Sequence, residues 1–158
     1  MRFVHQRAVV IGDVKAGDGT SVWPGAVIRA DLAPIRIGRD CSIQDNSVIH
    51  VEPGKPVAIG DNVIVGHGSL LHSCTIGDNV LVGIGSIVLD GCKIGSNVVI
   101  AAGTLLKPGT DVKSGSFVYQ KTGELVIKKV EKKHLELADS IRKSYSELAR
   151  KYAAGEMK

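Results

Sequence analysis

An aliphatic residue recurs every six positions along much of the chain, and this period limits the folds that are open to it. Every sixth position from residue 64 to residue 112 is aliphatic: Ile64, Leu70, Ile76, Val82, Val88, Ile94, Ile100, Leu106 and Val112. Each six-residue unit is therefore expected to form one short strand that places one aliphatic side chain inside. The aromatic content of only 4% agrees with a narrow interior built from thin layers.

A longer repeat of 17 or 18 residues contains three of these units. Its copies begin with Ile-Gly at residues 37, 59, 76 and 94, and a looser copy with its key positions at 10, 16, 22 and 28 precedes them. An insertion, VEPGKPVA, occupies residues 51–58. Three units per copy are expected to form one triangular turn of the chain, with one strand on each side. Glycine and asparagine in corner sequences such as IGDN can adopt the positive φ that tight bends require.

Stacked turns of this kind form a parallel β-solenoid, because each turn can bury its apolar face only against its neighbours. We therefore expect an all-β solenoid over residues 1–120. Beyond residue 116 the apolar residues recur at steps of three and four, at Leu135, Ala138, Ile141, Tyr145, Leu148 and Tyr152. This pattern predicts an amphipathic helix that ends near Gly155, within a C-terminal segment over residues 121–158 that packs along the solenoid.

The charge and the cysteines argue against several classes of protein. Residues 121–158 supply the whole net charge of +4, in the alternating pattern of a solvated helix rather than the basic stripe of a nucleic-acid-binding protein. Cys41, Cys74 and Cys92 form no CxxC pair and are predicted to be reduced packing residues. No signal-peptide pattern and no apolar run near the ~18 residues of a membrane span are present. We therefore expect a cytoplasmic protein that binds neither nucleic acid nor membrane.

One copy of the repeat carries two histidines where the next copy has aliphatic residues. Residues 65–74 read VGHGSLLHSC, and residues 82–91 read VGIGSIVLDG. His72 follows the Ile-Gly start of its copy by 13 residues, and His50 follows the start of the preceding copy by the same interval. Coils in register would place both in one column, about 4.8 Å apart. Each follows an inward residue, Ile49 or Leu71, so alternation turns both imidazoles outward, where they can share one metal ion.

His67 lies near the preceding corner, on a different side of the triangular coil, and is not expected to reach the other two histidines within one chain. A closed threefold assembly solves this geometry, because its heterologous contact brings His67 of one subunit to His50 and His72 of the next. We accordingly predict a homotrimer with a three-histidine metal site at each interface and a fourth position left for water. The alternative is that all three are surface histidines with no shared role.

Four segments make the chain similar to the hexapeptide-repeat proteins and, among them, to the γ-class carbonic anhydrases. They are WPGAVIRAD (23–31), IQDNSVIH (43–50), VGHGSLLHSC (65–74) and the C-terminal helix. The resemblance implies a left-handed parallel β-helix in which His50, His67 and His72 are the metal ligands, with His67 supplied by the adjacent subunit. It implies Zn²⁺ as the ion, with Fe²⁺ or Co²⁺ as alternatives, since three imidazoles suit several metals.

The same resemblance brings five further residues to the site. Arg29 and Asp31 match an Arg–Asp pair near the interface. Gln44 and Asp45 match a polar pair beside the metal-bound water, and Tyr145 matches a helix tyrosine that reaches the site. Each has a structural alternative, which is an interface salt bridge for the Arg–Asp pair, a coil-edge amide for Gln44, a turn for Asp45 and core packing for Tyr145.

The activity implied by the resemblance is the reversible hydration of CO2 to bicarbonate by a metal-bound hydroxide at the trimer interface. Three departures from the family pattern bear on proton transfer: Leu32 in place of a glutamate, the short loop at 51–58 in place of a longer acidic one, and YQKTGELV in place of a GxPAK segment. The alternatives on this scaffold are a hexapeptide-repeat acyltransferase, a thioesterase, and a metal-stabilised assembly subunit without catalytic activity.

Overall fold

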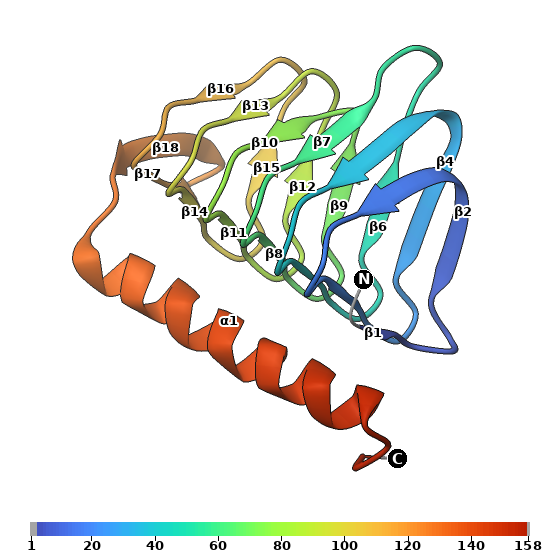
Figure 1. The fold of residues 1–158 in the computed structure, drawn as a ribbon. Helices are drawn as coiled ribbons and strands as arrows, with labels where there is room; N and C mark the ends of the chain where they lie inside the picture. The colour runs from blue at the N-terminus through green and yellow to red at the C-terminus, as the bar shows by residue number, and fades with distance from the viewer. Residues whose placement is uncertain (1–2, 158) are drawn as a thin grey trace.

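The structure, a computed structural model that describes residues 3–157, is a parallel β-solenoid and confirms the predicted fold class (Figure 1). Short strands wind into triangular coils, and the single helix α1 (Lys132–Ala153) runs along one outer face (Figure 1). The predicted division at residue 120 stays a prediction, and residues 1, 2 and 158 of the two predicted segments lie outside the described range.

The first face of the prism is one sheet, to which each coil contributes a strand. Its order is β1-β3-β5-β8-β11-β14-β17-β18. The bounds are β1 Phe3–Val4, β3 Ser21–Val22, β5 Ser42–Ile43, β8 Ile64–Val65, β11 Leu81–Val82, β14 Val99–Ile100, β17 Ser116–Lys121 and β18 Glu124–Lys129.

The other two faces belong to a second sheet, because β2 (Val9–Ala16) and β4 (Val27–Ile37) are long enough to turn a corner and serve both faces. The second face continues through β6 Val48–His50, β9 Leu70–His72, β12 Ile87–Val88 and β15 Leu105–Leu106. The third face continues through β7 Val57–Ile59, β10 Thr75–Ile76, β13 Lys93–Ile94 and β16 Asp111–Val112.

Aliphatic side chains fill the interior column by column, because the parallel strands pair in register. On the second face Ile49, Leu71, Val88 and Leu106 are successive Cα partners, and all four are fully buried. Dispersion contacts between identical positions of neighbouring coils thus replace the mixed contacts of an ordinary globular core. The three cysteines are free and buried, as predicted, and burial raises the pKa of Cys74 to about 12.

The six-residue pattern is correct from Ile76 onward, but its first two positions are wrong. The coil that begins at Ile59 has one residue fewer than the next, so the inward column passes through Val65 and Leu71. Ile64 is buried outside the prism, in a cluster with Ala138 of α1. Leu70 is half-buried on the outer surface of the second face. A strict count of six backward from Ile76 fails here, because the inward positions Leu71 and Ile76 are only five positions apart.

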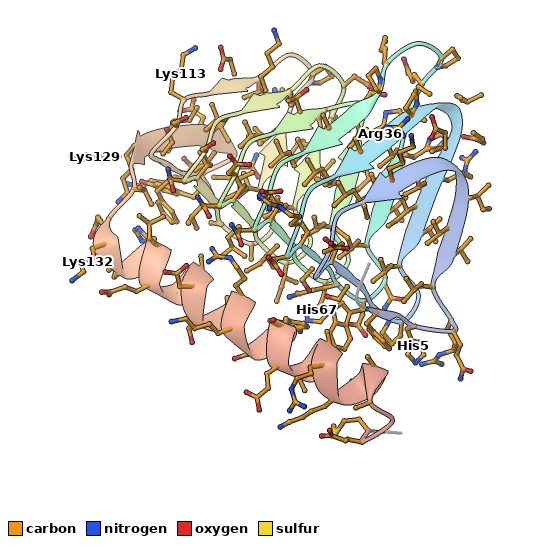
Figure 2. All side chains as sticks on the ribbon, in the orientation of Figure 1. His5, Arg36, His67, Lys113, Lys129 and Lys132 are labelled. Atoms are coloured by element: carbon orange, nitrogen blue, oxygen red, sulfur yellow. The ribbon has the colours of Figure 1, made fainter. Side chains whose placement is uncertain are left out.

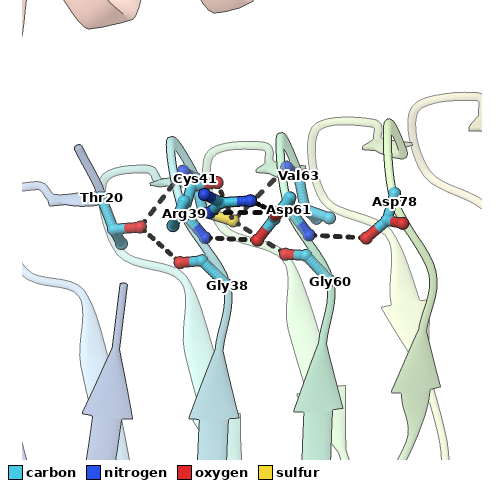
Figure 3. A network of polar contacts seen from close by, with 8 residues as sticks. All are labelled: Thr20, Gly38, Arg39, Cys41, Gly60, Asp61, Val63 and Asp78. Atoms are coloured by element: carbon cyan, nitrogen blue, oxygen red, sulfur yellow. Dashed lines mark hydrogen bonds and ion pairs between the residues drawn. The ribbon is translucent and has the colours of Figure 1, made fainter. Parts of the chain in front are cut away.

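The corner that carries the IGDN sequences is held by a ladder of hydrogen bonds between coils. The backbone N–H of Arg39 donates to Asp61 Oδ1 at 2.7 Å, and the N–H of Asp61 donates to Asp78 Oδ1 at 2.8 Å (Figure 3). The Arg39 guanidinium also pairs with Asp61 at 2.8 Å. Asn62 follows at a φ of 59°, the left-handed conformation that asparagine tolerates. The corner residues therefore tie each coil to the next.

A buried thiol completes this corner. Cys41 Sγ donates to the carbonyl of Gly60 at 3.1 Å and accepts the N–H of Val63 at 3.4 Å, while the hydroxyl of Thr20 donates to the carbonyl of Gly38 at 2.8 Å (Figure 3). These bonds satisfy backbone groups that the tight bend removes from the strand ladders. Burial raises the pKa of Cys41 to about 11, so the thiol stays protonated.

The C-terminal end of the solenoid is closed by a hairpin that the sequence reasoning did not foresee. β17 and β18 pair in antiparallel fashion through a turn at Thr122 and Gly123, both with positive φ, and Leu125 packs against the core. Helix α1 follows, with Glu131 as its N-cap residue and Arg150 and Lys151 in its last turn, where cations are favourable. Between residues 3 and 157 no helix offers the apolar length that a bilayer span requires.

The corrected register makes a prediction about neighbouring leucines. Leu71→Ala opens a cavity in the fully buried column and is expected to lower the free energy of unfolding by about 3 kcal/mol. Leu70 stands on the outer surface, so in the dissociated chain Leu70→Ala is expected to cost less than half as much. Urea unfolding followed by circular dichroism, at a protein concentration where size-exclusion chromatography shows the monomer, measures both losses, and equal losses would contradict the register.

The ladder predicts a pH-dependent contribution from Asp61. Hydrogen bonds from Arg39 lower the pKa of this carboxyl below its ordinary value of 3.8, so its contribution is complete above that value and is lost as the pH falls through the lowered pKa. Asp61→Asn should therefore be less stable than the wild type at pH 7, with the difference shrinking below pH 3. Urea unfolding at both pH values tests this, with the exposed Asp18→Asn as the control; a constant difference would argue against the charged pair.

Candidate metal centre

His50 and His72 stand side by side on the second face. β4, β6 and β9 pair in register, so Arg29, His50 and His72 occupy one outward column, as the equal sequence spacing predicts for the two histidines. The imidazole centroids are 5.2 Å apart, and His50 Nδ1 lies 3.2 Å from His72 Nε2. Both rings are partly shielded from solvent.

A carboxylate holds the other ring nitrogen of each histidine. Asp31 Oδ1 lies 3.1 Å from His50 Nε2, and Asp90 Oδ1 lies 2.7 Å from His72 Nδ1. Partial burial opposes ionisation of Asp31, but hydrogen bonds from Arg29 and His50 outweigh it and lower the pKa of Asp31. Burial likewise opposes ionisation of Asp90, and the hydrogen bond from His72 contributes to a lowered pKa. Both carboxylates are therefore ionised acceptors at neutral pH.

These contacts decide which nitrogens can bind a metal. An ionised carboxylate accepts only, so each imidazole, when neutral, is expected to carry its proton on the nitrogen that faces the carboxylate, which is Nε2 in His50 and Nδ1 in His72. The two nitrogens that face each other are then both bare lone pairs. Two nitrogens bound to one tetrahedral Zn²⁺ with bonds of ~2.0–2.1 Å are about 3.3 Å apart, close to the observed 3.2 Å. The donor pair thus fits a shared cation, which would also remove the lone-pair repulsion.

His67 lies elsewhere, on the side of the solenoid that faces α1 (Figure 2). Its Nδ1 is 3.0 Å from Asp45 Oδ2, and its Nε2 is 2.8 Å from the hydroxyl of Tyr145 on α1. Burial, aided by Asp45, raises the pKa of Tyr145, so the phenol keeps its proton and can donate it to Nε2. Within residues 3–157 of this one chain, no hydrogen bond or ion pair joins His67 to His50 or His72.

Gln44 is buried at the end of β5 and lines a cleft of about 500 Å³ between the first face and α1. His67 and Tyr145 line the same cleft, and the remaining lining is largely aliphatic. The structure therefore gathers the predicted residues into two groups. Arg29, Asp31, His50 and His72 form the first group, and Gln44, Asp45, His67 and Tyr145 form the second. Arg29 and Asp31 are ion-paired, which agrees with both the site role and the salt-bridge alternative.

Asp90 is a site residue that the sequence reasoning missed. Asp90 lies between two registers, because Val88 pairs with Leu71 but Lys93 pairs with Thr75, so the offset between the coils changes by one residue at this corner. An alignment by columns alone does not connect Asp90 with His72. One signal was available in the sequence. Asp90 directly follows Leu89, which is the repeat position equivalent to His72 in the next coil, and no other copy that begins with Ile-Gly has a carboxylate there.

Comparisons with known proteins agree with this fold. A model of the bacterial transferase hexapeptide (six repeats) matches residues 73–108, and a model of the hexapeptide repeat of succinyl-transferase matches residues 34–72. The crystal structure of a hexapeptide transferase family protein from Anaplasma phagocytophilum superposes with a TM-score of 0.82 and 34% identity, over 94% of this chain and 91% of that one. The chain belongs to this hexapeptide-repeat family.

Within the family the chain is like the γ carbonic anhydrases. It is 37% identical to gamma carbonic anhydrase 1, mitochondrial, of Arabidopsis thaliana, over 96% of this chain and 57% of that protein. It is 42% identical to the carbonic anhydrase of Geobacillus kaustophilus, over 56% of this chain and 48% of that protein. The chain thus spans about half the length of these curated relatives. The N-acyltransferase AntD of Bacillus cereus, with 13% identity and a TM-score of 0.71, shares the fold alone.

Proposed function

We propose that the chain is a metal-dependent CO2 hydratase that works as a homotrimer. His50 and His72 of one subunit and His67 of the next would hold the ion, with Zn²⁺ as the first candidate and Fe²⁺ or Co²⁺ as alternatives. The observation that carries the proposal is the pair of facing imidazole nitrogens, 3.2 Å apart, each with its partner nitrogen on a carboxylate. The relatives named as carbonic anhydrases support the same activity.

The outer surface of the second face supports the trimer. An aliphatic stripe in register runs beside the histidine column and is only partly buried in the single chain: Val27, Val48, Leu70, Ile87 and Leu105. On the corner of His67, Ile84 of the next coil is 58% exposed. Exposed aliphatic patches beside polar groups are typical of interfaces between subunits. We propose that the two patches meet, which would bring His67 to the histidine pair of the neighbour.

A bound divalent cation would supply Lewis acidity that makes water a nucleophile at neutral pH. The chain's own residues would do the rest. Gln44 would orient the attacking water through its carboxamide, and the aliphatic cleft would admit the apolar CO2. Arg29 would favour the developing negative charge of bicarbonate, to an extent reduced by its ion pair with Asp31. Tyr145 would have to release His67 Nε2 before this nitrogen could bind the ion.

Metal stoichiometry tests the shared site. His50→Ala and His67→Ala should each lose nearly all bound zinc, because each removes a ligand from every site. Co-refolded in equal amounts, the two variants should recover about a quarter of the wild-type metal, since one random pair of neighbours in four supplies both intact halves. His5→Ala serves as the control. Full occupancy in His67→Ala, or no recovery on mixing, would contradict the cross-subunit site.

Stopped-flow CO2 hydration tests the activity. Zinc- or iron-loaded wild type should hydrate CO2, and His72→Ala should lower kcat/KM beyond the ~10–100-fold that loss of an outer carboxylate produces. Acetyl-CoA cleavage and acyl transfer are measured in parallel on the same preparations. Thioester cleavage or acyl transfer without hydration would favour the other enzyme classes, and a metal-bound trimer inactive in all three assays would favour an assembly subunit.

A further inference from the structure

Each of the three histidines has one ring nitrogen beside its own carboxylate. Asp31 serves His50 at 3.1 Å, Asp45 lies 3.0 Å from His67, and Asp90 serves His72 at 2.7 Å, the shortest of the three. Carboxylates behind metal-binding imidazoles fix the ring orientation and the tautomer. The family resemblance of the sequence drew attention to Asp31 and Asp45, and it assigns no role to Asp90.

We infer that Asp90 is the positioning residue of His72: by accepting the Nδ1–H of this ring, it presents Nε2 as a lone pair toward His50. The inference deepens the proposed function and rests on it for the part that concerns metal binding. The part that concerns the tautomer holds for the metal-free protein as well. Asp90 acts through His72 and is not itself expected to contact the ion.

The backbone holds Asp90 rigidly in place. Residues 89–92 form a tight turn in which the N–H of Cys92 donates to the carbonyl of Leu89 at 3.2 Å and Gly91 has a φ of 69°. The carbonyl of Asp90 accepts the N–H of Gly109 from the next coil at 2.8 Å. The turn fixes the backbone of Asp90, so only the torsions of its short side chain remain to be ordered by the contact with the imidazole.

The turn itself does not require a carboxylate. In the next coil residues 107–110 form the same turn, with the N–H of Thr110 donating to the carbonyl of Lys107 at 3.1 Å, and Pro108 stands where Asp90 stands. Proline suits this turn position at least as well as aspartate. The carboxylate is therefore explained by its contact with His72 and not by the needs of the backbone.

A second carboxylate nearby offers a matched control. Single ligand atoms of Glu52, His72 and Asp90 all lie within 4.8 Å of one another, an arrangement that could itself hold a cation. Glu52, however, is ion-paired with Lys55 at 2.6 Å, and Lys55 also acts on Asp90 through its charge. A cation bound among these three groups would have to displace or oppose the ammonium. Glu52→Gln therefore separates a positioning role of Asp90 from a cluster that binds metal directly.

The experiment compares wild type, Asp90→Asn, Asp90→Ala and Glu52→Gln, each checked for wild-type circular dichroism and oligomeric size. Long-range ¹H–¹⁵N NMR of the metal-free proteins at pH 8 reports the tautomer of His72, and competition with a chelator reports the Kd for zinc. We expect the Nδ1–H tautomer in the wild type and Glu52→Gln, and a shift toward Nε2–H in both Asp90 variants. We also expect the Kd for zinc to rise ~10–100-fold in the Asp90 variants alone.

The two readouts distinguish the failure of each proposal. An unchanged tautomer in the Asp90 variants would overturn the positioning role, whatever the zinc affinity. Equal weakening of zinc binding by Glu52→Gln would also overturn it, because the carboxylates would then be direct ligands. If the wild type binds no zinc but the Asp90 variants still change the tautomer, the proposed function fails and the positioning role of Asp90 stands.

Discussion

Parallel pairing in exact register between successive coils is the interaction on which the rest of the structure depends. Each strand residue of one coil lies one strand spacing from its partner in the next, so a single position of the repeat becomes a column on the surface or in the core. Inside, the columns stack Ile49, Leu71 and Val88. Outside, the same geometry stacks His50 and His72. A shift of register by one residue would turn aliphatic residues outward and separate the two imidazoles.

The candidate metal centre depends on the orientation of the imidazole rings as well as on this regular frame. Stacking alone places two imidazoles at the strand spacing, but it does not decide which nitrogens face each other. By the inference above, the carboxylates of Asp31 and Asp90 decide it, because each would hold a proton on the nearer nitrogen of its histidine and leave the other nitrogen free. The solenoid holds the backbone of both carboxylate residues in place, since Asp31 lies within β4 and Asp90 lies in a hydrogen-bonded turn. Pre-organised donor atoms of this kind need little reorganisation when an ion binds.

If the proposed function holds, each chain carries an incomplete site that needs the third histidine of a neighbour. His67 sits on a different side of the coil, with Asp45 on one nitrogen and Tyr145 on the other. Its separation from the pair follows from the triangular cross-section, which no local adjustment can overcome. The aliphatic stripe on the second face and the exposed Ile84 on the His67 corner are the surfaces that a neighbouring subunit would cover. Assembly and metal binding are therefore expected to be coupled.

The sequence by itself determined the coil, because a six-residue aliphatic period admits few other ways to bury one side chain per unit. It also determined the His50–His72 column, since equal distances from equivalent Ile-Gly starts survive folding when coils stack in register. It offered two answers for the inward phase in the coil that carries His72, since the count of six chose Ile64 and Leu70 while the alternation before His72 chose Leu71, and the structure supports Val65 and Leu71. Only the tertiary structure decided the closing hairpin and the partner of His72, because Asp90 reaches that ring from the corner of the next coil, where the coils differ in length and no column can be read from the repeat.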